Sequence, residues 1–358
     1  MIRALVTGGS GFIGSALVRH LVRDRHAQVT NVDALTYAAT NESLAEIASR
    51  PNYRFVHADV CDLDRMRSLL LETRPRWIFH LAAETHVDRS IEDPLLFVRT
   101  NVMGTAVLLK AALEYFDTLP AEEREVFRWI HASTDEVFGP RDLEETADER
   151  TAYHPSSPYA ASKAGSDHLA HAWRRTYGLP VIVTYCCNIY GPYQFPEKLI
   201  PVVVSRAARG DTIPIYGTGE NRRDWMFVED HARALLRTVQ LGQPGATYCL
   251  AGHAERRNID VVHAICDLLD CKLGPLASGS RRSLIRHVAD RPGHDFRYGM
   301  DDARNVRMLD WRPLMSLEDG LAHTVAWYLD NRPWWERLLR REGDVPGRHG
   351  LARPVSGA

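Results

Sequence analysis

Short apolar runs that alternate with longer helical segments are the feature that most constrains the fold of this chain. Strands are expected at 3–7, 29–32, 54–56, 77–82, 128–132 and 181–185. Helices are expected between them at 13–23, 63–72, 94–116 and 158–177. Strands joined by helices of this length pair in parallel through right-handed crossovers. The predicted class is α/β, with a doubly wound parallel sheet covered on both faces.

The texture of the sequence changes after residue 187, which suggests two domains. Residues 1–187 are predicted to form the first, with a later segment near 224–250 returning to it. Residues 188–330 are predicted to form a smaller mixed α/β domain that binds substrate, because NIYGPYQFPEKLIP and TIPIYGTGENRRDW are rich in Pro, Gly, Tyr and charge. The tail 342–358 has the composition of a flexible terminus.

The composition argues against several classes of protein. A formal net charge of -2 favours neither a nucleic acid nor a membrane surface as partner. No stretch approaches about 20 apolar residues, the length of a membrane span. The start MIRALVTGGSG has no signal-peptide pattern, and the six cysteines lack the CxxC spacing of a metal site and suggest no disulfide framework. A cytoplasmic location without a metal is therefore expected.

A glycine-rich turn follows the first expected strand. Gly9, Gly11 and Gly14 have the spacing GxGxxG, which lets the backbone approach a pyrophosphate at a helix N-terminus. A tight strand-to-helix turn also favours glycine, so the motif alone decides little. Asp33 ends the second strand, 19 residues beyond Gly14, where a carboxylate binds ribose hydroxyls and repels a 2'-phosphate. Together these features predict NAD as the cofactor.

The predicted cofactor site extends along the ends of the neighbouring strands. Asp59, after the third strand, suits either the adenine edge or the N-cap of the next helix. The residues predicted to bind NAD are Gly8, Gly11, Phe12, Ile13, Gly14, Asp33, Leu35, Thr36, Asp59, Val60, Leu81, Ala82, Ala83, Thr100, Tyr159, Lys163 and Asn188.

A tyrosine and a lysine stand four residues apart in the helix expected at 158–177. Tyr159 and Lys163 therefore share one face of that helix. A phenol ordinarily has a pKa of about 10, and a nearby cation lowers it, so Lys163 is expected to make Tyr159 a usable base. The same spacing also occurs on solvated helix faces, so the pair by itself leaves both interpretations open.

Three polar residues follow the fifth expected strand. Thr134, Asp135 and Glu136 stand at its carboxyl end, where ligands bind in such sheets. The hydroxyl of Thr134 is placed to bond the substrate oxygen that Tyr159 deprotonates. Neighbouring carboxyls push their pKa values apart, which predicts one acid and one base. Without this context, a helix cap or a turn is the alternative.

The motifs STDEVFG, YxxxK, YGPYQFPEKLIP, NRRDWMFVEDHARAL, NIDVV and ADRPGHD resemble consecutive signatures of the dTDP-glucose 4,6-dehydratases. These enzymes belong to the extended short-chain dehydrogenase/reductases, which have a Rossmann-type fold. The resemblance extends from Thr7 to about Trp327. It implies that dTDP-glucose is the substrate and that the catalytic residues are Thr134, Asp135, Glu136, Tyr159 and Lys163.

The resemblance also implies an intramolecular redox cycle. Tyr159 removes the proton of the sugar's 4-hydroxyl while NAD accepts hydride from carbon 4. The ketone acidifies the proton on carbon 5, which Glu136 removes. Asp135 protonates the departing 6-hydroxyl, and the hydride returns to carbon 6, leaving a 4-keto-6-deoxy sugar with the cofactor as it began.

The substrate residues follow from the same resemblance and from the need for a cation at the pyrophosphate. Arg223 is either that cation or a surface ion pair, and Asn258 is either a polar contact or a helix N-cap. His86 and Arg89 either contact the sugar or order their loop. The predicted substrate residues are Thr85, His86, Asn188, Glu197, Lys198, Leu199, Pro214, Tyr216, Arg223, Asn258, Arg291 and His294.

Two positions depart from the family pattern. Phe138 stands where a tyrosine is usual, which we interpret as a packing change. Ile189 stands where a second asparagine is usual beside Asn188, which alters local hydrogen bonding. The family pattern further implies a homodimer through the helices 94–116 and 158–177.

Related activities share much of this pattern. Other nucleotide-sugar 4,6-dehydratases, 4-epimerases and decarboxylases share the glycine motif and YxxxK, and a non-catalytic relative that senses NAD and a sugar nucleotide is a remoter alternative. Asp135 favours a dehydratase over an epimerase or a decarboxylase, because neither of these needs an acid that expels water. Thymidine rather than uridine rests on resemblance alone, since one methyl group is worth only about 1–3 kcal/mol in an apolar pocket.

Overall fold

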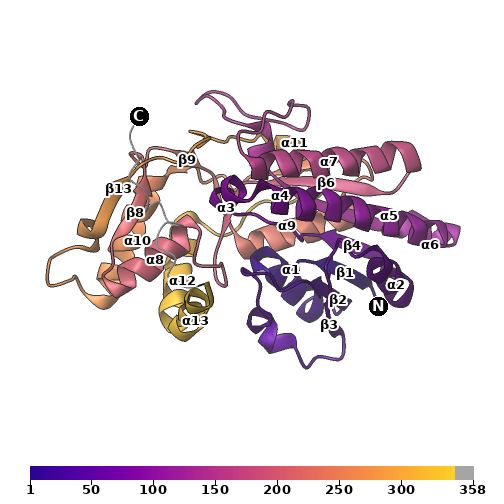
Figure 1. Cartoon of the computed structure of the whole chain (residues 1–358), viewed down its shortest axis with the longest axis horizontal. Coiled ribbons are helices and arrows are strands. Elements are labelled where there is room, and N and C mark those ends of the chain that lie inside the picture. The colour runs from indigo at the N-terminus through magenta and orange to yellow at the C-terminus, as the bar shows by residue number, and fades with distance from the viewer. Residues whose placement is uncertain (343–358) are drawn as a thin grey trace.

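A computed structural model describes residues 1–342 of the chain (Figure 1). Its centre is a seven-stranded sheet in the order β11-β6-β5-β4-β1-β2-β3, and every neighbouring pair in it is parallel. The predicted α/β class with a doubly wound parallel sheet is therefore confirmed. The strands are β1 (Arg3–Thr7), β2 (Gln28–Asp33), β3 (Tyr53–His57), β4 (Trp77–His80), β5 (Arg128–Thr134), β6 (Val181–Cys186) and β11 (Thr247–Leu250).

Helices cover both faces of this sheet, because successive strand residues point to opposite sides. Val6 of β1 packs with α1 and α9 on one face of the sheet. Its neighbour Leu5 packs with α2, α5 and α7 on the opposite face. The helices of this part are α1 (Phe12–Arg23), α2 (Leu63–Thr73), α3 (Val87–Glu92), α4 (Pro94–Phe97), α5 (Gly104–Asp117), α6 (Ala121–Val126), α7 (Pro158–Tyr177), α9 (Val228–Leu241) and α11 (Ala303–Leu309). The 3-10 helices η1 (Asn41–Ile47) and η3 (Asp135–Phe138) complete it.

Helix α7 shows how the local sequence sets the boundaries. The side chain of Ser157 caps the helix by accepting from Ala160 N, and Pro158 occupies the first turn, where its missing N–H costs nothing. Gly178 ends the helix in a left-handed conformation with φ 75°. These signals explain why the predicted range 158–177 is confirmed at both ends.

The expected helix 94–116 is interrupted. Its first turn, α4, runs into a π-helical turn (η2, Val98–Met103) before α5 begins. The six expected strands are all present with ends within two residues of prediction, although β4 ends at His80 rather than at residue 82. Residues 81–83 instead leave the sheet and line the cavity described below.

The continuous helical run Pro94–Asp117 is the one described helix long and apolar enough to cross a membrane by length and composition. The run continues through the π turn to 24 residues, but Arg99, Lys110 and Glu114 interrupt it, so it is not the unbroken apolar stretch that the sequence was searched for. Core helices of soluble proteins pass the same test, and 44% of its most apolar window is buried, so the match is weak evidence for a span.

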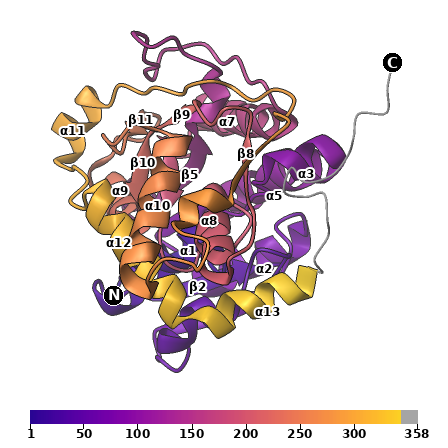
Figure 2. The same ribbon diagram turned by 90° about the vertical axis from the view of Figure 1, so that its left-hand side faces the viewer.

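The part of the chain after Cys187 builds a further, smaller core, called the second core below. Its helices lie to the left of the central sheet in Figure 1 and in front of it in Figure 2. Its helices are α8 (Leu199–Arg209), α10 (Asn258–Leu273), α12 (Leu317–Asp330) and α13 (Arg332–Glu342), with the 3-10 helix η4 (Arg281–Leu284). Short strands pair within it: β7 (Asn188–Tyr190) with β10 (Trp225–Phe227), β8 (Ile213–Tyr216) with β13 (Ile285–Val288), and β9 (Arg222–Arg223) with β12 (Arg256–Arg257).

The chain crosses between the two parts more than once. Residues 228–250 return to the central sheet, where α9 packs on α1 and β11 extends the edge beside β6. At the C-terminus, α13 ends at Glu342, the first residue of the expected flexible tail. The rest of that tail, 343–358, lies outside the described residues.

The two-sided core predicts a large effect at β1. Leu5 is completely buried, so Leu5→Ala is expected to lower the free energy of unfolding by about 2–5 kcal/mol in urea denaturation. Leu71→Ala on α2, where the side chain is 55% exposed, is the matched control and is expected to cost under about 0.5 kcal/mol. Equal losses for the two variants would contradict the assigned packing.

Candidate functional site

A cavity of about 500 Å³ lies between the carboxyl edge of the sheet and the second core. Every residue predicted for cofactor, catalysis or substrate lines it except Leu35. Arg89 is also outside the lining. Parallel strands end together at this edge, which explains why residues far apart in sequence meet there.

The glycine turn after β1 forms one wall of the cavity. Gly8 has φ +71°, and a Cβ on it would lie 2.7 Å from Ala82 N. A Cβ on Gly14 would lie 2.0 Å from Gly8 O, so α1 can begin this close to the turn only without a side chain. Gly9 serves packing instead, because a Cβ there would meet Asn31 Oδ1 at 2.3 Å. Together, Gly8 and Gly14 leave bare backbone facing the cavity.

Asp33 ends β2 beside this turn and is 7% exposed. Its carboxylate accepts hydrogen bonds from Ser10 N (2.9 Å) and Leu35 N (2.8 Å). Leu35 therefore contributes its backbone, at φ +51°, while its side chain is outside the lining. Burial raises the pKa of Asp33, and the two backbone hydrogen bonds oppose that rise. The carboxylate is thus held in a fixed position at the cavity wall.

Asp59 lines the cavity beyond β3. It accepts from Arg99 Nη2 at 2.7 Å and from Cys61 N at 2.9 Å. The N-cap of α2 is Asp62, whose side chain accepts from Arg65 N. The N-cap interpretation of Asp59 is therefore wrong.

Thr134 and the two carboxyls after it form the 3-10 turn η3 at the end of β5. Thr134 caps that turn by accepting from Glu136 N at 3.3 Å, so the cap interpretation of the segment is correct alongside its place in the cavity. Asp135 is 5% exposed, and burial, followed by the charge of Glu136, raises its pKa to about 8. Asp135 therefore holds its proton near neutral pH, as a general acid must.

Tyr159 and Lys163 are 8% and 6% exposed, so the solvated-face interpretation is wrong. Lys163 Nζ donates to Ala132 O of β5 at 2.7 Å. Burial, followed by the charge of Glu136, raises the pKa of Tyr159 well above its usual value, and a hydrogen bond with Thr134 opposes the rise. The expected lowering by Lys163 is therefore not the dominant effect, because burial outweighs it.

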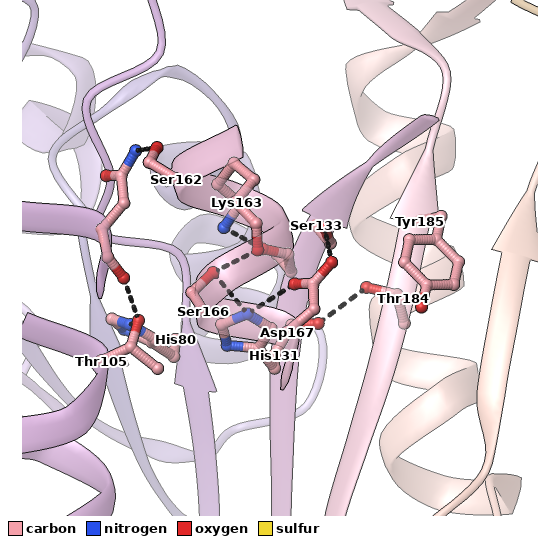
Figure 3. Close-up of polar contacts among 12 residues, drawn as sticks. His80, Thr105, His131, Ser133, Ser162, Lys163, Ser166, Asp167, Thr184 and Tyr185 are labelled. Carbon is pink, nitrogen blue, oxygen red and sulfur yellow. Dashed lines mark hydrogen bonds and ion pairs between the residues drawn. The ribbon is translucent and has the colours of Figure 1, made fainter. Parts of the chain in front are cut away.

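Buried hydroxyls and imidazoles connect the strands behind this pair (Figure 3). The ring of His80 on β4 is bonded through Nδ1 to Thr7 Oγ1 (2.8 Å) and through Nε2 to Thr105 Oγ1 (2.9 Å). From α5, Thr105 donates to Asn101 O, and Asn101 Nδ2 donates to Ser162 Oγ at 2.8 Å. The chain of contacts fixes β1, β4 and α7 relative to one another.

Arg223 reaches the cavity from the second core. It is 5% exposed and donates to the carbonyls of Arg222, Asp295 and Phe296. Its guanidinium also lies 4.5 Å from the ring centre of Tyr298. The surface ion-pair interpretation is therefore wrong, and Arg223 is a buried cation held by backbone.

Glu197 lines the cavity and is the centre of a cluster of polar side chains. It accepts from Tyr37 OH at 2.8 Å and lies 3.6 Å from Arg89 Nε. His86 Nε2 is 3.9 Å from the same carboxylate, and His86 Nδ1 accepts from Arg89 N as the cap of α3. The loop-ordering role weighed for His86 and Arg89 is therefore present.

Asp88 lines the cavity but was not among the residues predicted from the sequence, although it contacts the predicted residues Tyr216 and Arg291. It accepts from Tyr216 OH at 2.7 Å and lies 3.6 Å from Arg291 Nη1. This carboxylate connects α3 of the first part to β8 and the loop after β13. The signal was available in the segment ETHVDRS, where Asp88 follows His86 by two residues.

Several buried polar atoms on the cavity wall have no partner among the described residues: Asn258 Oδ1, Gln194 Oε1 and both ring nitrogens of His231. Asn258 is the first residue of α10, whose N-cap is Arg257, so the N-cap interpretation of Asn258 is wrong. Unpaired polar atoms in a buried wall are costly, which indicates a polar ligand in this cavity.

The two departures from the family pattern occupy different environments. Phe138 is 1% exposed and packs edge-on against Tyr153 and Tyr185, which agrees with a packing change. Ile189 is 8% exposed and lines the cavity, so it presents an apolar surface there. Within residues 1–342, no group of three or more His, Cys, Asp or Glu side chains could hold a metal ion.

Comparisons with known proteins find relatives that match nearly the whole chain. A family model described as GDP-mannose 4,6 dehydratase matches residues 5–324. A dTDP-glucose 4,6-dehydratase of Escherichia coli is 50% identical over 98% of this chain and 99% of its own length. One of Neisseria meningitidis is 52% identical over 95% of this chain and 96% of its own.

Solved structures extend the comparison. The dTDP-glucose 4,6-dehydratase DesIV of Streptomyces venezuelae, with NAD and TYD bound, has a TM-score of 0.86 and 43% identity, covering 94% of this chain and 100% of its own. A UDP-glucose 4-epimerase of Thermotoga maritima, with UDP-glucose, has a TM-score of 0.80 and 27% identity, covering 92% and 100%. The fold is thus shared with epimerases.

The burial of Asp135 predicts a pH-dependent stability. Its folded pKa of about 8 lies above the ordinary value of 3.8, so the folded state prefers the protonated carboxyl and stability is lost as pH rises from about 4 to about 8. Asp135→Asn removes this loss, and its melting temperature is expected to gain on that of the wild type across the same range. Each pKa unit is worth about 1.4 kcal/mol, so the free energy of unfolding of Asp135→Asn is expected to rise relative to that of the wild type by on the order of a few kcal/mol over this range.

The same substitution at the exposed Asp330 at the end of α12 is the matched control for this prediction. A constant difference in melting temperature between Asp135→Asn and the wild type from pH 4 to pH 8 would contradict the raised pKa of Asp135.

Proposed function

The chain belongs to the dTDP-glucose 4,6-dehydratase family, and we propose that it is the lyase that converts dTDP-glucose to dTDP-4-keto-6-deoxyglucose with bound NAD. The observation that supports this reaction best is the buried, proton-holding Asp135 next to Glu136 at the end of β5. An acid and a base on adjacent residues match the elimination of water across two adjacent carbons.

The cavity fits NAD. The bare backbone at Gly8 and Gly14 accommodates a pyrophosphate at the start of α1, and Asp33 is fixed where ribose hydroxyls are bound. When bound, NAD supplies a hydride acceptor for carbon 4 and the donor that later reduces carbon 6, with a positively charged nicotinamide in its oxidised form. The remaining predicted cofactor residues line the same cavity, Leu35 contributing only backbone.

In this proposal Tyr159 and Thr134 bind the 4-hydroxyl of the sugar. Thr134 opposes the rise in the pKa of Tyr159 through a hydrogen bond, so the two hydroxyl groups already share one proton network. To accept the proton of the 4-hydroxyl, Tyr159 must first lose its own, against the rise in its pKa that burial causes. The buried Lys163 on the same helix face stabilises that phenolate. Exclusion of water from this buried pair strengthens that charge interaction.

The two carboxyls then divide the elimination between them. Glu136, half-buried beside Asp135, takes the proton of carbon 5 once the 4-ketone has acidified it. Asp135 still holds its own proton and gives it to the departing 6-hydroxyl. A 4-epimerase has no use for this acid, so Asp135 favours dehydration over epimerisation on a shared fold.

Residues 188–330 are proposed as the domain that binds the sugar nucleotide. Arg223 is a buried cation suited to the pyrophosphate, and Asn258 offers an unpaired oxygen to the ligand. Arg291 and Tyr216 reach the same cavity through their contacts with Asp88. A phosphate would compete with Asp88 for Arg291, so substrate binding is expected to rearrange that contact.

A homodimer through the helices 94–116 and 158–177 is also proposed. Exposed apolar side chains gather at the start of the first of these, with Leu95 77%, Val98 49% and Met103 57% exposed. A second copy would cover these side chains and give the apolar run Pro94–Asp117 a role other than spanning a membrane.

A cytoplasmic location, with neither nucleic acid nor membrane as partner, is proposed on the cysteines and the charge. All six cysteines are free thiols, as is usual for proteins of a reducing compartment. The net charge is only -2, which gives no electrostatic attraction to a nucleic acid or an anionic membrane.

The first test of the function is turnover without added NAD. The purified protein is expected to convert dTDP-glucose into a product lighter by one water, detected by mass spectrometry, because the cofactor returns to its starting state and stays bound. UDP-glucose in parallel tests the nucleotide. An unchanged mass even with added NAD would favour an epimerase or a non-catalytic sensor.

The division of labour between the carboxyls is tested in deuterated water. Asp135→Asn is expected to slow product formation at least about 100-fold while the carbon 5 proton still exchanges with solvent, because oxidation and proton removal remain. Glu136→Gln is the matched variant and should lose that exchange. Full turnover by Asp135→Asn would contradict its role as the acid.

The dimer is tested by light scattering after gel filtration. The wild type is expected at twice the mass of the chain, and the double variant Leu95→Asp, Met103→Asp at the mass of one chain, because charge is costly in an apolar interface. Leu314→Asp, at a side chain 79% exposed elsewhere, is the control. A monomeric wild type would refute the proposed interface.

A further inference from the structure

A completely buried carboxylate stands one helical turn beyond Lys163 (Figure 3). Asp167 is 0% exposed and is not among the residues that line the cavity. It accepts from Ser133 Oγ at 2.6 Å and from Tyr153 OH at 3.2 Å, and it lies 3.0 Å from His131 Nε2. A buried carboxylate is costly, so its presence away from the ligands needs an explanation.

The contacts of Asp167 tie two elements of the site together. His131 and Ser133 lie on β5, immediately before Thr134, whereas Asp167 lies on α7 with Tyr159 and Lys163. The same carboxylate therefore joins β5, which leads directly into the turn with Asp135 and Glu136, to the helix that carries the phenol and the ammonium.

Lys163 itself needs a counter-charge. Its ammonium is buried, and its hydrogen bond goes to the neutral carbonyl of Ala132. Tyr159 and Asp167 stand four residues before and after it, so each is about 6 Å away along the axis, and they are about 12 Å from each other. Asp167 thus acts strongly on Lys163 and only weakly on Tyr159 directly.

The surrounding titratable groups do not supply that charge near neutral pH. Burial lowers the pKa values of His80 on β4, His131 on β5 and His171 on α7. Burial also raises the pKa values of Tyr153 in the loop before α7 and of Tyr185 and Cys186 on β6. These groups are therefore neutral, and from η3 the carboxyls of Asp135 and Glu136 face the phenol.

We propose that Asp167 is a positioning residue for this reaction, whose buried carboxylate keeps Lys163 in its charged form and locks β5 against α7. Burial lowers the pKa of Lys163, and the charge of Asp167 is the largest effect opposing that fall. Burial raises the pKa of Asp167 to about 6, with Lys163 the largest opposing effect, so the carboxylate is ionised above that pH. The kinetic consequence rests on the proposed function, whereas the charge of Lys163 does not.

The chain has only four lysines, at 110, 163, 198 and 272, so the lysine charge is directly measurable. Protein labelled with carbon-13 at the lysine ε position gives four NMR signals, and the Lys163 signal is assigned by Lys163→Arg. In Asp167→Asn the pKa of Lys163 is expected to fall by roughly one unit or more, the usual effect of an adjacent opposite charge. Tyr153→Phe, which removes a hydrogen bond to the same carboxylate but keeps its charge, is the matched control and should leave the Lys163 pKa near the wild-type value.

A kinetic readout tests the consequence for Tyr159. The substrate analogue dTDP-6-deoxyglucose has no 6-hydroxyl to eliminate. With this analogue, the absorbance of the NADH that forms reports only oxidation at carbon 4. The midpoint of the pH profile of this oxidation rate is expected to rise by roughly one unit in Asp167→Asn, because a less charged Lys163 stabilises the phenolate less. At a pH below both midpoints, the rate of the variant is then about tenfold lower than that of the wild type. Asp167→Glu should restore part of the shift.

The outcomes separate the two proposals. No oxidation by the wild type would count against the proposed function and leave the lysine titration intact, since that titration needs no substrate. An unchanged Lys163 pKa in folded Asp167→Asn would overturn the role of Asp167. If that variant does not fold, Lys163→Met is the second test, because loss of the ammonium should raise the pKa of Asp167 above about 6. The NMR signal of the Asp167 carboxyl carbon reports this pKa. An unchanged pKa of Asp167 would overturn the proposal equally.

Discussion

Charged side chains are buried at the carboxyl edge of the central parallel sheet, and each of them needs a compensating group nearby. The sheet brings the ends of β1, β2, β4, β5 and β6 to one side, and their polar side chains meet there out of contact with bulk water. Each charge must then find a partner or change its protonation state. Asp135 holds a proton, and Lys163 and Asp167 compensate each other across one turn of α7.

The two parts of the chain divide the work along this edge. Rigid strand ends and the start of α7 carry the groups proposed for chemistry, and the hydroxyl and imidazole contacts behind them hold those ends in register. The second core brings a buried cation and unpaired polar atoms to the same cavity. Asp88 joins the two parts across the cavity through Tyr216 and Arg291. A sugar nucleotide needs both halves, because its reacting carbons lie on the hexose, whereas its phosphates and nucleoside extend away from them.

The sequence revealed the sheet and most of the cavity lining because both depend on local patterns. Alternating apolar runs and the caps around α7 fix elements within a few residues, and strand-end positions then gather the site. The interruption at Val98–Met103 carried no such signal, and neither did the pairing of short strands in the second core. Partners that depend on tertiary packing were also beyond local patterns: Asp59 pairs with Arg99, and Arg223 is held by the carbonyls of residues far along the chain. The effect of burial on Tyr159 could not be predicted from its neighbour Lys163, because the depth of a side chain is a property of the whole fold.

In this mechanism, oxidation, elimination and reduction occur on one sugar in one cavity without release of the cofactor. It is tested most directly with dTDP-glucose that carries deuterium on carbon 4, followed by NMR of the isolated product. The expected product is a 4-keto-6-deoxy sugar with that deuterium on carbon 6, because the hydride taken from carbon 4 is returned within the same complex. Deuterium retained on carbon 4, or lost to solvent with carbon 6 unlabelled, would contradict it.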